Sequence, residues 1–341
     1  MPERALIVRL SALGDVVLAT PVLRALRRHL PAAQIDWLVE RSYLDLLVGN
    51  PHLSEAIGYD KRGVHRGATG FVRLRSELRR RHYDLVIDLQ AKPKTAALVR
   101  SLGAQQIASL KKRDGRSLLR AAVGLDRPLV RAHAVELYLE VLAELGVPGA
   151  GLALELPKRP GSRPAARGVG LAPGARWATK RWPAERFSEV GNRLSARGHA
   201  VVLIGGPGDG PELDAVRAGL DVPPILDTRT LPISGLIDAV GELEVLVAGD
   251  SGPVHIASAL GVPAVALFGP TTPLRWGPGG AQHRVVTRAL PCSPCSNHGS
   301  ARCPLGTHAC LLEIGAEEVA AAALAAIAAG RAGSVGAAAG R

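Results

Sequence analysis

The strongest constraint on the fold is a pattern that occurs twice: short apolar runs, each followed by a segment whose apolar residues have helical spacing. Runs that are apolar on both faces and alternate with helices are typical of a parallel sheet covered on both sides. A segment rich in proline and charge, residues 157–167, separates the two occurrences. The sequence therefore predicts an α/β protein with an N-terminal domain (1–156), a C-terminal domain (168–330) and a disordered tail (331–341).

The expected elements follow from these patterns. In the first half, strands are expected at residues 5–10, 35–39 and 85–89, and helices at 16–30 and 73–82. In the second half, strands are expected at 169–171, 200–204, 243–248 and 264–268, and helices at 185–197, 211–220 and 253–260. Open sheets of this kind bind ligands at the carboxyl ends of their strands.

Composition excludes several classes of protein. The chain has 341 residues, of which 47% are hydrophobic and 21% are charged, so it is not a disordered chain, a collagen or a disulfide-dense miniprotein. Its longest apolar run, residues 319–329, is shorter than the roughly 20 residues that span a bilayer. The N-terminus has no signal-peptide pattern. We expect a cytoplasmic globular protein.

The positive charge is concentrated in one stretch. The net charge is +12, and residues 61–131 contain 18 Lys or Arg and only five acidic residues, so this stretch carries the whole excess. Such a field attracts nucleic acid, an anionic membrane surface or an acidic substrate. It is also compatible with an ordinary solvated basic surface, so charge alone does not name the partner.

Gly14 and Asp15 follow the first predicted strand at the start of a helix. Backbone N–H groups at a helix start favour anions, and a glycine lets a ligand approach closely. An aspartate there can act as a general base that takes a proton from a hydroxyl group. The alternative is that Asp15 only stabilises the start of the helix.

A second candidate follows a strand of the C-terminal half. Ser251 and Gly252 precede Pro253, which suits the first turn of a helix, so their amides are exposed at its positive end. This arrangement can bind a diphosphate, with Asp250 before it and His255 one turn into the helix. His255 can alternatively be a structural histidine.

Lys180 and Arg181 lie after the first strand of the C-terminal half, just before a helix. A cation at this place can neutralise a phosphate. The alternative is ordinary surface charge, with Trp177 and Trp182 as packing residues.

All four cysteines, Cys292, Cys295, Cys303 and Cys310, lie within 19 residues. Cysteines grouped in this way in a cytosolic chain more often bind zinc or an iron–sulfur cluster than form disulfides. The spacing matches no zinc pattern well, so reduced loop cysteines or a redox pair remain open. None has a partner that indicates a catalytic thiol.

Five segments occur in an order that resembles a known family, the lipopolysaccharide heptosyltransferases of glycosyltransferase family 9, across nearly the whole chain. These segments are residues 9–16, 88–95, 173–183, 250–257 and 267–273. The resemblance implies a GT-B fold, in which two Rossmann-like domains face a central cleft. It implies that the N-terminal domain binds the acceptor and the C-terminal domain binds the donor.

The activity implied by the resemblance is an inverting, metal-independent transfer of heptose from ADP-heptose to the inner core (Kdo and heptose) of lipopolysaccharide. Asp15 matches the family's catalytic base and Lys180 its diphosphate-binding lysine. The donor-binding positions are Gly14, Lys180, Asp250, Ser251, Gly252, Pro253 and His255. No cofactor is expected for catalysis, and a structural zinc ion or iron–sulfur cluster at the four cysteines is left open.

The basic stretch then has a purpose, because the lipid A–Kdo core acceptor carries acidic sugars and phosphates on an anionic membrane face. Candidate contacts are Arg62, Arg66, Lys92 and Lys94. We therefore expect a cytoplasmic protein that is peripheral on the inner membrane.

Two other functions are compatible with parts of the sequence. One is a family 9 enzyme that uses a different nucleotide sugar or acceptor. The other is a nucleic-acid-binding protein with a four-cysteine metal site. Aromatic residues that could stack on bases are scarce in the basic stretch, where only Phe71 and Tyr83 occur, so no nucleic acid is expected.

Overall fold

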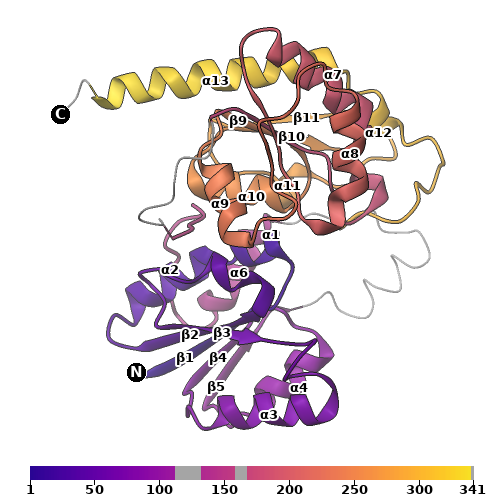
Figure 1. Ribbon diagram of the computed structural model, residues 1–341. Helices are drawn as coiled ribbons and strands as arrows, with labels where there is room; N and C mark the ends of the chain where they lie inside the picture. The colour runs from indigo at the N-terminus through magenta and orange to yellow at the C-terminus, as the bar shows by residue number, and fades with distance from the viewer. Residues whose placement is uncertain (112–131, 158–166, 339–341) are drawn as a thin grey trace. The chain divides into compact units, whose positions relative to one another are not determined.

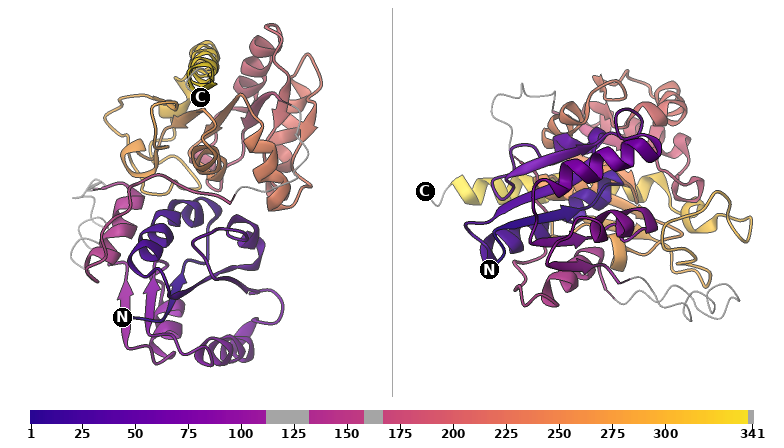
Figure 2. Two further views of the ribbon diagram at one scale, coloured as in Figure 1. Left: turned by 90° about the vertical axis from the view of Figure 1, so that its left-hand side faces the viewer. Right: turned by 90° about the horizontal axis from the view of Figure 1, so that it is seen from below.

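The computed structural model describes residues 1–111, 132–157 and 167–338, which form two compact units, each built on one sheet (Figure 1, Figure 2). Unit 1 contains the described residues 1–111 and 134–157, and unit 2 contains residues 132–133 and 167–338. Most of the expected linker, the basic residues 112–131 and the last three residues lie outside the described residues.

Unit 1 has a five-stranded sheet in which the strand pairs are parallel and the order is β3-β2-β1-β4-β5. The strands are β1 (Arg4–Val8), β2 (Gln34–Glu40), β3 (Glu55–Tyr59), β4 (Leu85–Asp88) and β5 (Gln106–Ser109). The helices are α1 (Leu13–Leu18), α2 (Thr20–His29), α3 (Gly67–Arg79), α4 (Pro93–Arg100) and α6 (Ala134–Ala143), with a 3-10 turn at Arg41–Leu46.

Helices cover both faces of this sheet because its strands are apolar on both sides. Leu6 and Val8 of β1 belong to a core with Leu74 of α3 and Leu98 of α4. The alternate residues of β1, such as Ile7, are also fully buried and point to the opposite face, where α1, α2 and α6 lie (Figure 1).

Unit 2 has a six-stranded parallel sheet in the order β11-β10-β9-β6-β7-β8. The strands are β6 (Val169–Ala172), β7 (Val201–Leu203), β8 (Leu226–Asp227), β9 (Val245–Gly249), β10 (Ala264–Phe268) and β11 (Arg284–Thr287). The helices are α7 (Ala184–Ser195), α8 (Gly210–Ala218), α9 (Ile233–Gly241), α10 (Gly252–Leu260), α11 (Pro273–Trp276), α12 (Ala309–Leu312) and α13 (Ala316–Ala338).

The core of unit 2 lies mainly between the sheet and α7, α8, α12 and α13. It contains Phe187 of α7, Val216 of α8, Leu311 of α12 and Val319 of α13. The helices α9, α10 and α11 lie on the other face (Figure 1). The two compact sheets therefore agree with the predicted α/β class.

The strand order of each sheet reverses beside its first strand. In unit 1 the chain moves from β1 to β2 and β3 on one side and then to β4 on the other. In unit 2 it moves from β6 to β7 and β8 and then to β9 on the opposite side. Ligands of doubly wound sheets bind at such reversal points, outside the carboxyl ends of the strands.

One local expectation differs from the structure. The single helix expected at residues 16–30 consists of α1 and α2, which are separated at Ala19. Helix α13 extends to Ala338, because the sequence here is mostly alanine, the residue with the highest helix propensity; disorder of the tail 331–341 stays a prediction. None of the described helices is both long and apolar enough to cross a bilayer.

Candidate functional site

Asp15 lies in the first turn of α1, at the reversal point between β1 and β4. One carboxylate oxygen is 2.7 Å from a guanidinium nitrogen of Arg9 and accepts a hydrogen bond from the hydroxyl of Tyr138 at 3.1 Å. The other oxygen accepts a hydrogen bond from the backbone N–H of Ala12 at 3.1 Å. The side chain keeps 24% of its surface exposed, so a hydroxyl group of a ligand can reach it.

Arg9 holds this carboxylate in the ionised form. Burial of Asp15 favours the neutral acid, but the Arg9 guanidinium and the hydrogen bonds from Ala12, Arg9 and Tyr138 outweigh it, so the pKa of Asp15 lies below its ordinary value. Arg9 is itself buried, donates to the carbonyl of Leu89 at 2.5 Å and lies 5.1 Å from the ring centroid of Tyr138. The site therefore presents a fixed negative charge at neutral pH.

The hydrogen bond from Ala12 shows that Asp15 also stabilises the start of α1. The two interpretations of this residue are compatible, because the oxygen that accepts from Ala12 keeps a further lone pair and part of the side chain is exposed to a ligand. Gly14 lies beside it in unit 1, whereas the other predicted donor-binding residues lie in unit 2.

The predicted acceptor contacts follow β3 and β4, at the same edge of the sheet as Asp15: Arg62, Arg66 and Lys92 lie in loops, and Lys94 lies in the first turn of α4. Arg62, Arg66 and Lys92 are exposed. The amine of Lys94 donates to the hydroxyl of Tyr59 and lies 5.0 Å from its ring centroid. Because the carboxyl ends of parallel strands meet at one edge, these cations share it with the Asp15 carboxylate.

In unit 2, Lys180 and Asp250 come together at the reversal point between β6 and β9. The Lys180 amine is 2.7 Å from a carboxylate oxygen of Asp250, and the two side chains are only 15% and 5% exposed. The hydroxyl of Thr271, after β10, donates to the same carboxylate at 2.7 Å. A Cβ placed on Gly249 would stand 2.8 Å from the Lys180 carbonyl oxygen, so only glycine allows this approach of β9.

The helix start beside this pair is open to an anion. Ser251 is the N-cap residue of α10 but its side chain caps no helix amide, and Pro253 occupies the first turn. Within the described part of the chain, the buried Ser251 Oγ has no hydrogen-bond partner. His255, one turn into the helix, is only 4% exposed. The backbone amides of α10 are therefore available at the positive end of the helix.

Arg181 does not share this role. Its guanidinium forms an ion pair with Glu212 of α8 and donates to the carbonyl of Ala175 at 2.9 Å. Its side chain thus ties the loop after β6 to α8, and Lys180 remains the cation of this loop that the structure brings to Asp250.

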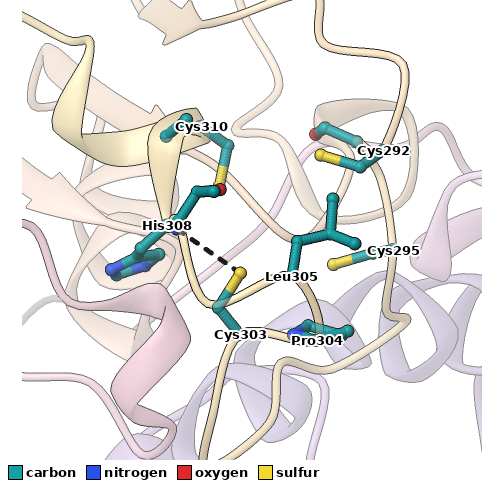
Figure 3. A pocket seen from close by; sticks show the side chains of 10 residues that line it. Cys292, Cys295, Cys303, Pro304, Leu305, His308 and Cys310 are labelled. Atoms are coloured by element: carbon teal, nitrogen blue, oxygen red, sulfur yellow. Dashed lines mark hydrogen bonds between the residues drawn. The ribbon is translucent and has the colours of Figure 1, made fainter.

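The four cysteines lie around one cavity of about 220 Å³, which Pro304 and Leu305 also line (Figure 3). All four are free thiols. A hydrogen bond from the His308 amide lowers the pKa of Cys303, whereas burial raises the pKa of Cys295 and raises that of Cys310 to about 11. The structure thus brings together residues that the sequence placed up to 18 positions apart.

Sequence reasoning missed three residues of these sites: Arg9, Tyr138 and Thr271. Arg9 lies inside the segment 9–16 and could have been selected as the nearest cation to Asp15. Tyr138 is 123 positions from Asp15, and Thr271 is 21 positions from Asp250. No local pattern pairs either of them with its carboxylate.

Comparison with known proteins places this geometry in context. The profile of glycosyltransferase family 9 (heptosyltransferase) matches residues 71–304. Lipopolysaccharide heptosyltransferase 1 of Pseudomonas aeruginosa is 30% identical over 313 residues, which cover 86% of each chain. The crystal structure of a family 9 glycosyltransferase from Veillonella parvula superposes with a TM-score of 0.78 at 26% identity, covering 95% of this chain and 97% of that one. The E. coli ADP-heptose lipopolysaccharide heptosyltransferase II has the same fold, with a TM-score of 0.75 at 22% identity over 96% of this chain and 99% of that one.

Proposed function

Because the chain belongs to glycosyltransferase family 9, the heptosyltransferase family, we propose that it transfers heptose from ADP-heptose to the inner core of lipopolysaccharide. The relative from P. aeruginosa carries the name lipopolysaccharide heptosyltransferase 1 and matches over most of both chains. The name of the E. coli neighbour includes ADP-heptose as well as lipopolysaccharide. These names support the donor and the acceptor class, and the site residues support the chemistry.

We assign activation of the acceptor to unit 1. The Asp15 carboxylate takes the proton of an acceptor hydroxyl as that oxygen bonds to the anomeric carbon of the donor and the bond from this carbon to ADP breaks. Displacement from the face opposite ADP inverts the anomeric centre. A carboxylate of low basicity suffices, because a sugar that loses its leaving group develops oxocarbenium character and accepts a weak nucleophile.

We assign binding of the departing diphosphate to unit 2. Lys180 neutralises its charge, and the amides at the start of α10, with the Ser251 hydroxyl, donate hydrogen bonds to its oxygens. These groups can perform the charge stabilisation that a metal ion performs in other transferases, so the proposed transfer needs no catalytic metal. Asp250 holds Lys180 in place until the diphosphate binds.

The exposed cations of unit 1 support an acidic acceptor at a membrane. Arg62, Arg66 and Lys92 point to solvent from loops at the edge of the sheet where Asp15 lies. A Lys or Arg close to an anionic lipid surface contributes about 1 kcal/mol to the free energy of membrane binding. We therefore infer a cytoplasmic enzyme that works peripherally on the inner membrane and glycosylates the Kdo–lipid A core there.

The observation that carries the proposal is the site of unit 2, where a nearly buried lysine and an uncapped helix start meet at the reversal point of the sheet. This combination suits a nucleoside diphosphate better than a neutral ligand.

Mass spectrometry tests the proposal. The purified chain is incubated with ADP-heptose and with truncated core acceptors that end in Kdo or heptose, in buffer with EDTA. We expect one heptose to be added to the acceptor and ADP to be released in equal amount. Parallel incubations with other nucleotide sugars cover the alternative of a different donor. Transfer of another sugar in place of heptose would overturn the donor assignment, and loss of transfer in EDTA would overturn metal independence.

A further inference from the structure

The turn between β1 and α1, which leads to Asp15, lies beyond the strand pairing of the sheet. Its backbone amides therefore need acceptors other than a neighbouring strand. The N–H groups of Leu10 and Ser11 both donate to Oε1 of Gln90, at 3.0 and 3.3 Å. The next amide, that of Ala12, donates to the Asp15 carboxylate at 3.1 Å. The side chain of Gln90 thus binds the turn immediately beside the amide that binds Asp15.

We propose that Gln90 is a positioning residue of the transfer reaction, because its carbonyl oxygen fixes the turn that sets the place of the Asp15 carboxylate. The inference rests on the proposed function, in which Asp15 takes the proton of the acceptor hydroxyl. Gln90 acts through the backbone of the turn and exchanges no proton itself. A base must stand within hydrogen-bond reach of the proton that it takes, so a displacement of this turn slows the transfer.

Gln90 suits this role because its own position is fixed. It is 7% exposed and lies just after β4, where its backbone N–H donates to the Val8 carbonyl at 3.2 Å and to Asp88 Oδ1 at 3.0 Å. The same Asp88 oxygen accepts from the amide of Ala91 at 2.9 Å. Ala91 has a φ of 45°, a left-handed conformation that residues with a side chain rarely adopt. The turn after β4 therefore holds the Gln90 side chain against the turn after β1.

Two further contacts hold the same turn. The guanidinium of Arg9 donates to the Leu89 carbonyl after β4 at 2.5 Å, and another of its nitrogens is 2.7 Å from the Asp15 carboxylate. On the opposite side of β1, the Leu10 carbonyl accepts from the amide of Glu40 in β2 at 3.0 Å. The turn that leads to Asp15 is therefore tied to both strands that flank β1.

The chemical type of the side chain also fits a positioning role. A glutamine presents a neutral carbonyl oxygen with two lone pairs, which matches the two N–H donors of the turn. A glutamate would accept the same two hydrogen bonds but would add a negative charge to the turn that carries Asp15. A like charge raises the pKa of a carboxyl group. Glutamine therefore holds the turn and leaves the Asp15 carboxylate in its ionised form.

Single-turnover rates of the full chain test the proposal. They are measured with ADP-heptose already bound and a saturating acceptor in the wild type, Gln90→Leu, Gln90→Glu and the control Gln106→Leu. Gln106 is an exposed residue of β5, so the control makes the same change away from the turn. Gln90→Leu should transfer roughly 10- to 100-fold more slowly, the cost of a misplaced reacting group. Its calorimetric affinity for ADP-heptose should match the wild type, because the residues assigned to the diphosphate lie in unit 2. Gln106→Leu should keep the wild-type rate.

The glutamate variant separates positioning from contact with the substrate. Gln90→Glu keeps the acceptor oxygen, so its rate should return to near the wild type above an acid limb that the added charge moves to higher pH. A rate as low as that of Gln90→Leu at every pH would show that the NH2 group is needed, and would overturn the positioning role. A Gln90→Leu rate equal to that of Gln106→Leu would overturn it as well. If Gln90→Leu does not fold, Gln90→Asn replaces it with the same expected loss, because its carboxamide is one methylene too short to reach both amides.

Hydrogen exchange tests the contact independently of transfer. It is followed by mass spectrometry on peptides that contain Leu10 and Ser11. Exchange there should be faster in Gln90→Leu than in the wild type, Gln90→Glu and Gln106→Leu, because both amides lose their acceptor. Equal exchange in all four proteins would show that Gln90 does not fix the turn. A wild type that transfers no heptose would refute the proposed function, and faster exchange in Gln90→Leu would then still show that Gln90 holds the turn.

Discussion

Replacing Lys180 by methionine separates the two roles that the structure gives this residue. Asp250 is 5% exposed, and without the lysine its charge is left buried with the Thr271 hydrogen bond as its remaining support. Breaking a buried ion pair by removing one partner costs about 3–5 kcal/mol. Because Thr271 still donates a hydrogen bond to the carboxylate, we expect a loss of unfolding free energy at the lower end of this range, about 3 kcal/mol. Such a loss lowers the Tm of a domain of this size by about 6–12 °C.

The double variant Lys180→Met/Asp250→Asn removes the uncompensated charge and keeps an acceptor for Thr271. We therefore expect differential scanning calorimetry to show recovery of more than half of the lost Tm. Donor use should not recover, because the cation that binds the diphosphate is still absent. A hydrogen bond to a charged group contributes about 1.5–3 kcal/mol, so kcat/KM for ADP-heptose should fall roughly 10- to 150-fold in both variants.

Either of two results would contradict these roles of Lys180. If the double variant recovers donor kcat/KM together with stability, Lys180 only compensates Asp250 and does not bind the diphosphate. If the single variant melts with the wild type, the ion pair does not stabilise unit 2, and the burial argument is wrong.

Two further perturbations follow from the site geometry. In Arg9→Gln the pKa of Asp15 should rise, because the nearby positive charge that lowers it is gone, and the acid limb of the kcat/KM–pH profile should move to higher pH. Tyr138→Phe, which removes one hydrogen bond, should move this limb less in the same direction. If the acid limb of Arg9→Gln coincided with that of the wild type, the role of Arg9 would be refuted. Gly249→Ala should push the Lys180 carbonyl away, cost about 1–3 kcal/mol and weaken donor binding. In the control Gly241→Ala the new Cβ meets only Leu260 at 3.7 Å. Calorimetry should show unchanged stability for this control, and titration should show unchanged donor affinity. Equal effects of the two substitutions would contradict the steric argument.

The sequence predicted those elements of the fold in which burial and hydrophobic periodicity agree. The strands at the centre of both sheets are apolar on both faces, and each was predicted near its observed position, as for β1, β4, β6, β9 and β10. Elements at the edges carry weaker patterns. β5 exposes three of its four residues, and β8 has only two residues, so neither produces a continuous apolar run.

Some residues of the candidate site could likewise be predicted from the sequence, and others could not. Asp15, Lys180 and the residues at the start of α10 lie beside strand ends, where residue type and position together indicate a ligand. Contacts between different elements could not be predicted, because no local pattern pairs residues that are far apart in the sequence. Tyr138 reaches Asp15 from α6, and Thr271 reaches Asp250 from the loop after β10. The convergence of the cysteines likewise depends on how the loop from residue 292 to 310 folds back, which its spacing does not specify.

The most direct test of the central claim is the rate of a single turnover by Asp15→Asn with ADP-heptose already bound and a Kdo-terminated acceptor added. Asparagine keeps the size of the side chain and an acceptor for the Ala12 amide but cannot take the proton. We expect the transfer rate to fall about 10²- to 10⁴-fold, while the calorimetric affinity for ADP-heptose stays within about a factor of two of the wild type. A transfer rate within tenfold of the wild type would show that Asp15 is not the base.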